Sequence, residues 1–177
     1  MAAVITETEV PARAEAKARS SKVSALVLPA LLFVAWGFAL SGSTAPGAVA
    51  GEATAMGYLR WILYFTGFVM LFSSVMHSVF AKSMAASIGW KTNGFQYELA
   101  AVSLGLGGAC FYAVYNGIEA MVAVSIPIVS FLALAGVNHV VEIVRKHNYA
   151  PNNTMILIWD FGIPISLVAL LVSIGTF

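Results

Sequence analysis

The sequence predicts an all-α fold: a polytopic membrane helical bundle with five transmembrane helices. Of its 177 residues, 60% are hydrophobic and 10% are charged, whereas soluble domains average about 45–50% and about 25%. Five apolar segments approach or exceed the roughly 20 residues that a helix needs to cross a hydrocarbon layer about 30 Å thick. Turn-forming glycine, proline and asparagine residues separate these segments. We therefore expect residues 23–177 to form one transmembrane bundle.

Each predicted element consists of an apolar run and the turn residues that end it. The first run is the shortest and is followed by "SGSTAPGAVAGE"; the next three are followed by "IGWKTNG", "NGIE" and "HNYAPNN". The predicted spans are approximately 23–40, 58–81, 96–115, 121–144 and 154–177.

The segment before the first span, residues 1–22, is predicted to be a cytoplasmic tail or a short surface helix, because "PARAEAKARSSK" combines alanine with basic residues. An alternative is that the first span is a signal peptide. Basic residues precede it, and "AVA" at Ala48 to Ala50 resembles a cleavage site. The apolar run exceeds the usual length of a signal peptide's hydrophobic region, about 7–15 residues, which favours a retained span.

Lysine and arginine residues set the expected orientation, since short cytoplasmic loops are enriched in them. The first and third loops contain Glu52 and Glu119 but neither lysine nor arginine. This asymmetry predicts an N-inside, C-outside topology. Arg60, near the outer end of the second span, is the exception, and we expect its side chain to extend to the membrane surface. The basic residues of the N-terminal segment and of the second and fourth loops are Arg13, Lys17, Arg19, Lys22, Lys82, Lys91, Arg145 and Lys146.

Several classes of function lack their usual sequence features. The formal net charge of +1 gives no basic excess for binding nucleic acid. There is no glycine-rich phosphate loop and no cysteine pattern typical of a zinc site. Cys110 is the only cysteine, so an intrachain disulfide is impossible. We therefore expect the chain to lie in the lipid bilayer and not to bind nucleic acid.

Polar side chains occur within four of the spans, all toward the cytoplasmic side. His77 precedes Lys82 by five residues, or about 7–8 Å along a helix, and His139 precedes Arg145 by six, or about 9 Å. Because a charged side chain facing lipid is costly, we expect these groups to converge on each other or on a wet cavity. The predicted buried polar cluster consists of His77, Glu98, Asn138, His139 and Asp160.

Small residues in the third span predict which of its faces packs. Glu98 shares a face with Ala101, Gly105, Gly108 and Ala109. Membrane helices approach closely through small residues, so we expect Glu98 to point into the bundle. Helix packing, within the chain or between chains, is predicted to use Ser103, Gly105, Gly107 and Ala109.

Three stretches of the sequence resemble a family of small multi-pass bacterial membrane proteins of unknown function, an uncharacterised domain family. They are "FQYELAAVSLGLGG", "LAGVNHVVE" and "WDFGIPI". The matching positions are Glu98, Gly136, Asn138, His139 and Asp160. The resemblance covers the chain from about Trp61 to the C-terminus. It implies a shared helical bundle in a bacterial inner membrane and no assigned activity.

The first functional hypothesis is a non-enzymatic subunit or ligand-binding component of a membrane complex. Short loops leave no extramembrane domain to house catalysis, and the complex would contain other membrane subunits or further copies of this chain. The polar cluster would then organise the bundle and receive a cytoplasmic ligand. A purely structural hydrogen-bond network that holds four helices together is an equally open interpretation. Whether the protein is an enzyme also stays open.

Two further hypotheses assign chemistry to the cluster. In a redox or metal-binding subunit, His77 and His139 would be axial ligands of haem b, or would bind copper, iron or zinc together with Asp160 or Glu98. In a proton-coupled transporter or channel, the same histidine and carboxyl groups would form a proton relay. The outer half of the bundle offers mostly serine and glycine, so no continuous polar path is visible in one chain.

Overall fold

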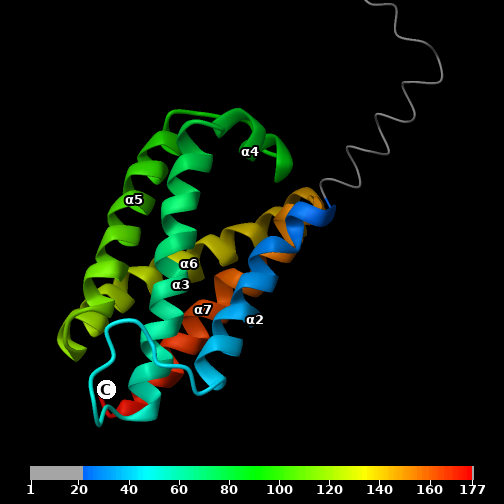
Figure 1. Ribbon diagram of the computed structural model, residues 1–177. Helices are drawn as coiled ribbons and strands as arrows, with labels where there is room; N and C mark the ends of the chain where they lie inside the picture. Colours follow the sequence, from blue (N-terminus) through cyan, green and yellow to red (C-terminus); the bar gives the residue numbers. More distant parts are fainter. Residues whose placement is uncertain (1–21, 177) are drawn as a thin grey trace, which may run out of the picture.

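Five long helices and one short helix make up residues 22–176, the part of the chain that the computed structural model describes (Figure 1). A helical turn at residues 22–25 continues into the first helix, so the first candidate span is Lys22–Leu40. The all-α fold with five helices long and apolar enough to cross a membrane is confirmed. The tail predicted for residues 1–22 lies, except for Lys22, outside the described residues. The helices are α2 (Val27–Leu40), α3 (Thr54–Ser78), α4 (Ala81–Ser87), α5 (Phe95–Val114), α6 (Ile118–Lys146) and α7 (Pro151–Ile174).

The turn between α6 and α7 shows how local sequence ends a helix. His147 adopts a left-handed backbone conformation with φ of 51°, and the backbone N–H groups of His147 and Asn148 both donate to the carbonyl of Glu142. This pattern satisfies carbonyls that the end of a helix leaves free. Pro151 then begins α7, where its missing N–H group costs nothing.

The second span differs from its prediction at both ends. It begins at Thr54 instead of residue 58, because the carbonyl of Ala53 already accepts hydrogen bonds from Met56 and Gly57. It ends at Ser78 instead of residue 81, where the Ser78 hydroxyl donates back to the Ser74 carbonyl. The alanine-rich α4 follows as a separate helix, which the hydropathy pattern did not predict because it is too short to span a membrane.

Helix α3 is central to the bundle and contacts every other helix of the described chain. In Figure 1, α3 and α5 run side by side, while α2, α6 and α7 pass obliquely across them. Helix α6 packs on α7 and α5, and α2 packs on α3 and α7. Since consecutive spans alternate in direction, the α3–α5 and α6–α7 connections lie at one end of the bundle. The α2–α3 and α5–α6 connections lie at the other.

The α3–α5 contact depends on small residues. A Cβ atom on Gly107 would lie 2.8 Å from Leu71 Cδ2 and 3.1 Å from the Gly67 carbonyl oxygen. One turn away, the hydroxyls of Ser73 and Ser103 lie 3.4 Å apart. Of the predicted packing positions, Ser103 and Gly107 therefore lie at this interface.

The expected inward face of α5 is wrong. Glu98, Gly105 and Ala109 are exposed, and a Cβ atom on Gly105 would meet nothing within 4 Å. Helix α5 has small residues on two faces, so residue size alone could not identify the packed one. The face that packs inward carries Ala100, Ser103, Gly107, Cys110, Ala113 and Val114.

Large apolar side chains remain exposed along the spans. Half or less of each candidate span's apolar window is buried, and the exposed side chains include Phe33, Phe72, Leu134 and Ile165. Soluble monomers rarely expose such extensive apolar surface. Lipid is the environment that fits this surface.

Candidate functional site

Three segments of the chain converge on the imidazole of His139, which is buried on α6. From α7, the side-chain oxygen of Asn153 lies 2.7 Å from His139 Nδ1, and Asp160 Oδ2 lies 3.9 Å from His139 Nε2. From the connection between α4 and α5, the indole of Trp90 stacks on the imidazole, with ring centroids 5.4 Å apart and planes at 22°. We call these four residues, Trp90, His139, Asn153 and Asp160, the His139 site.

Glycine and asparagine residues bring the three segments together. A Cβ atom on Gly136, one turn before His139, would lie 3.1 Å from Asp160 Cβ, so glycine lets α7 approach α6 closely here. Asn148 joins the two connections at this end of the bundle, because its side-chain amide donates to the Ile88 carbonyl at 2.8 Å. Gly89, with φ of 78°, makes the turn that directs Trp90 toward His139.

The Asp160 carboxylate is buried, and one of its oxygens lacks a hydrogen-bond donor in residues 22–176. It is 2% exposed, and its Oδ2 atom has no hydrogen-bond partner among the described residues. In that part of the chain, the only other buried side-chain atoms without a partner are the indole nitrogens of Trp90 and Trp159. Trp90 belongs to the His139 site, and Trp159 precedes Asp160 in sequence. The unpaired atoms are thus concentrated at and next to the His139 site. Within the site, Asp160 Oδ2 is an unpaired acceptor and Trp90 Nε1 is an unpaired donor.

Of the five residues predicted to form a buried cluster, only His139 and Asp160 are placed together by a polar contact. His77 is half-buried, and its Nδ1 atom lies 3.3 Å from the Gln96 amide nitrogen. Glu98 and Asn138 are exposed, so their predicted burial is wrong. In the helix geometry, Asn138 is rotated by about 100° from its neighbour His139, and only one of the two can face α7.

The donor set gives no support for a metal centre. Within residues 22–176, no group of three or more His, Cys, Asp and Glu side chains is placed to hold a metal ion. His77 bonds to Gln96 and His139 bonds to Asn153, so each imidazole belongs to a separate hydrogen-bond group. Neither the proposed paired haem ligation nor the combination of both histidines with Asp160 or Glu98 matches these contacts.

Two residues of the His139 site were not predicted from the sequence. Trp90 and Asn153 lie in the segments "IGWKTNG" and "HNYAPNN", which were interpreted as turns. Asn153 is the last residue of the predicted turn "HNYAPNN", and nothing in that pattern distinguished it from the other turn residues. Its role depends on a contact with His139, 14 residues earlier in the chain.

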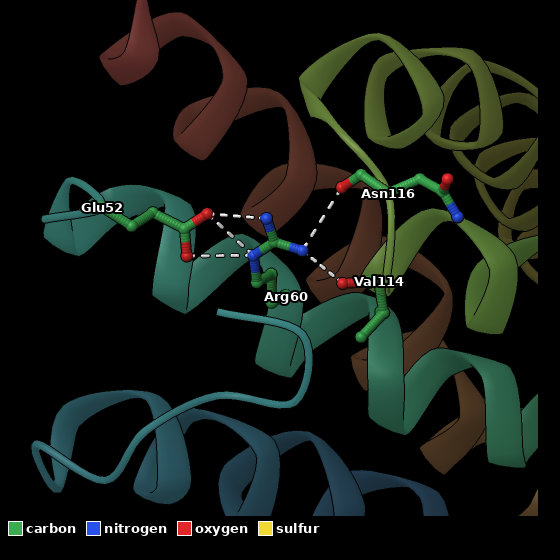
Figure 2. A network of polar contacts seen from close by, with 4 residues as sticks. All are labelled: Glu52, Arg60, Val114 and Asn116. Atoms are coloured by element: carbon green, nitrogen blue, oxygen red, sulfur yellow. Dashed lines mark hydrogen bonds and ion pairs between the residues drawn. The ribbon is translucent and has the colours of Figure 1, made fainter. Parts of the chain in front are cut away.

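A second buried polar group was also missed, at the other end of the bundle (Figure 2). Arg60 is 3% exposed and does not extend to the membrane surface as expected. Its Nε and Nη2 atoms donate to the Glu52 carboxylate at 2.6–2.9 Å. Its Nη1 atom donates to the carbonyl of Val114 and, at 3.3 Å, to that of Asn116. We call Glu52, Arg60 and these two carbonyls the Arg60 latch.

The Arg60 latch joins two adjoining segments to a third that lies 54 residues further along the chain. Glu52 lies in the α2–α3 loop, Arg60 in α3, and the two carbonyls at the end of α5 and in the α5–α6 turn. The same loop also touches α5 at Gly47, where a Cβ atom would collide with the Val114 carbonyl. The sequence did contain a signal for this ion pair. Glu52 and Arg60 are a single glutamate and a single arginine in segments that are otherwise uncharged.

Comparison with known protein families matches residues 22–174 to a family of unknown function, DUF6790. The chain belongs to DUF6790. The predicted membership of an uncharacterised family is confirmed, but its extent was predicted too narrowly, because the match includes the first span. No curated protein and no solved structure matches the chain.

The first span is part of the fold of this DUF6790 member. Helix α2 packs on α3 and α7, and the Trp36 indole donates to the Ser166 hydroxyl of α7 at 2.9 Å. Leu32 and Ala35 of α2 belong to the hydrophobic core.

Proposed function

We propose that this DUF6790 member is a non-enzymatic integral membrane protein that binds a small cation at the His139 site as one component of a membrane complex. The observation that supports it is the Asp160 carboxylate, which is 2% exposed with one oxygen unpartnered. Burying a polar acceptor without a donor is costly, and burying an isolated charge is more so. A cation between Asp160 and His139 would remove that cost.

The short connections support a non-catalytic role. The described chain has no extramembrane domain, and its longest connection between spans, residues 79–94, contains only the short helix α4. The His139 site also lacks a hydroxyl or thiol nucleophile among its four residues. Partners in the complex would be other membrane subunits or further copies of the chain, in contact with the exposed apolar faces.

The orientation we propose is N-inside and C-outside in a bacterial inner membrane. Lys82, Lys91, Arg145 and Lys146 lie at or near the end of the bundle that carries the α3–α5 and α6–α7 connections, as expected for a cytoplasmic end. The His139 site is nearer to that end, so its cation would come from the cytoplasm.

Cysteine labelling tests the orientation. Ser43→Cys and Asn93→Cys place one thiol in each kind of loop, and both positions are exposed. In a Cys110→Ala background, a membrane-impermeant maleimide should label residue 43 from outside intact cells and residue 93 only in inverted vesicles. The reverse pattern would contradict the proposed topology.

Thermal unfolding of the full chain in detergent tests the cation site with two probes, zinc chloride and pH. We expect at least one probe to shift the melting temperature of the wild type, and Asp160→Asn to lose that response. Glu98→Gln is the matched control, because Glu98 is an exposed carboxylate on a neighbouring span, and it should respond as the wild type does. If the wild type and Asp160→Asn respond equally to both probes, the proposed cation site does not exist.

A further inference from the structure

Hydrogen bonds at the His139 site determine which ring nitrogen carries a proton. The side-chain amide of Asn153 donates through Nδ2 to the Asn148 carbonyl at 3.0 Å, which turns its Oδ1 atom toward His139. An amide oxygen can only accept, so the partner atom, His139 Nδ1, must donate. The opposite amide orientation would place two acceptors against each other at the Asn148 carbonyl. His139 therefore has its proton on Nδ1, and Nε2 of the neutral ring is an acceptor.

Two acceptors then face each other on the other side of the ring. His139 Nε2 and Asp160 Oδ2 are 3.9 Å apart, and Oδ2 has no other partner among the residues described. A neutral imidazole beside an ionised carboxylate would place two lone pairs and a net charge of −1 in a buried position. Neither group could hydrogen-bond the other.

We propose that the cation of the His139 site is a single proton shared between His139 Nε2 and Asp160 Oδ2, an inference that rests on the proposed function. The proton lies either on Nε2, as an imidazolium facing a carboxylate, or on Oδ2, as a carboxylic acid facing a neutral imidazole. Both forms have zero net charge, and both convert two facing acceptors into a donor and an acceptor. The proton is therefore a property of the pair.

The surroundings favour a proton over a larger ion. Trp90 covers one face of the imidazole, and Gly136 brings α6 and α7 together beside Asp160. A transition metal would need further ligands beyond one imidazole and one carboxylate, and no third His, Cys, Asp or Glu is placed for it in residues 22–176. A proton on either atom needs no third ligand, and the 3.9 Å between the two atoms suits an ion pair rather than a direct hydrogen bond.

The other charged groups near the pair are paired or exposed, and one of them, Glu142, acts on His139 through its charge. On α6, Glu142 is 8% exposed and pairs with Lys146, and Arg145 is exposed. On α7, Asn153 is neutral, and in the α4–α5 connection Lys91 is exposed. On α3 and α5, His77 bonds to the neutral Gln96. Within the described chain, no further ion pair reaches His139 or Asp160.

Ring nitrogen NMR tests the proposal at the level of single atoms. The chain has three histidines, so His77→Gln with His147→Asn leaves His139 as the only one. The full chain, labelled with ¹⁵N-histidine in lipid nanodiscs, should show a protonated Nδ1 throughout a titration from about pH 5 to about pH 10. Nε2 should change its signal in a single step that Asp160→Asn abolishes or moves by at least one pH unit. Identical Nε2 titrations with and without Asp160 would overturn the shared proton.

The pH dependence of unfolding gives an independent measurement if the histidine variants fold poorly. Above about pH 8, an aspartate and a histidine in an unfolded chain hold almost no proton. A folded pair that holds one proton loses stability as pH rises, and the unfolding equilibrium constant increases about tenfold per pH unit until the proton is released. Asp160→Asn should remove this slope, because an amide donates to Nε2 without a titrating proton, whereas Glu98→Gln should keep it. A flat wild-type profile, or one that rises with pH, would overturn the proposal. A retained zinc response would then still support the broader cation site.

Discussion

The Arg60 latch makes a quantitative prediction about the α2–α3 loop. The substitution Glu52→Gln removes the negative partner of a guanidinium whose side chain is 4% exposed. Breaking a buried ion pair by removing one partner costs about 3–5 kcal/mol, because the other charge stays buried without compensation. The two carbonyl acceptors at Val114 and Asn116 remain and stabilise part of that charge. We therefore expect a loss near the lower end, about 3 kcal/mol in the free energy of unfolding.

A double-mutant cycle separates the charge pair from the carbonyl contacts. Arg60→Met leaves the Glu52 carboxylate with 9% of its side chain exposed and without a partner, so it should cost at least as much as Glu52→Gln. The double variant Arg60→Met/Glu52→Gln has no uncompensated charge. It loses the hydrogen bonds to two carbonyls, at about 1 kcal/mol each. Its cost should be smaller than the sum of the single variants by about 2 kcal/mol or more.

Reversible unfolding in mixed micelles, followed by circular dichroism, measures these differences. Arg145→Met is the matched control, because Arg145 is exposed at the other end of the bundle and should change stability by less than about 0.5 kcal/mol. An arginine that simply extends to the membrane surface would behave like this control. A cost below about 1 kcal/mol for Arg60→Met would therefore refute the latch and restore the interpretation made from the sequence.

Two further predictions concern close packing and the support of His139. Gly107→Val should destabilise the bundle by about 1–3 kcal/mol, because the added side chain would collide with α3. Gly105→Val is the control and should leave stability nearly unchanged, because a Cβ atom there meets nothing within 4 Å. Equal effects of the two substitutions on thermal unfolding would contradict the packed face of α5. Asn153→Ala leaves His139 Nδ1 and the Asn148 carbonyl without their hydrogen-bond partner, and should cost about 1–3 kcal/mol by the same measurement. An unaffected melting temperature would show that Asn153 does not hold the ring.

The five spans could be predicted from composition because the requirement is simple: enough consecutive apolar residues to cross the hydrocarbon layer. Which face of each helix packs inward could be predicted only where polarity marks it. On α6, His139 was predicted to face inward and is buried, while its polar neighbour Asn138 is exposed. On α5, two faces carry similarly small, apolar side chains. For that reason the prediction that Glu98 points into the bundle was wrong.

Most partners of the buried polar groups could not be predicted because they lie on other helices or loops; Glu52, 8 residues before Arg60, is the exception. His139 is 14 residues from Asn153, and Arg60 is 54 residues from Val114. Considering each residue alone predicted that Arg60 extends to the membrane surface and that Trp90 belongs to a turn. Only the packed bundle shows that Arg60 is buried and that Trp90 stacks on the imidazole of His139.

The two buried polar groups differ in a way that separates a structural role from a binding role. Arg60 donates five hydrogen bonds to three residues, three of them to Glu52, so the five N–H groups of its guanidinium are almost fully engaged. Asp160 is buried just as deeply, yet one of its oxygens has no donor. In a bilayer, water does not replace a missing partner, so a carboxylate kept in this state is a cost that a purely structural residue would not carry. An asparagine at position 160 would supply its own donor, and the bundle should tolerate it; loss of folding in Asp160→Asn would show instead that the carboxylate itself holds the helices together.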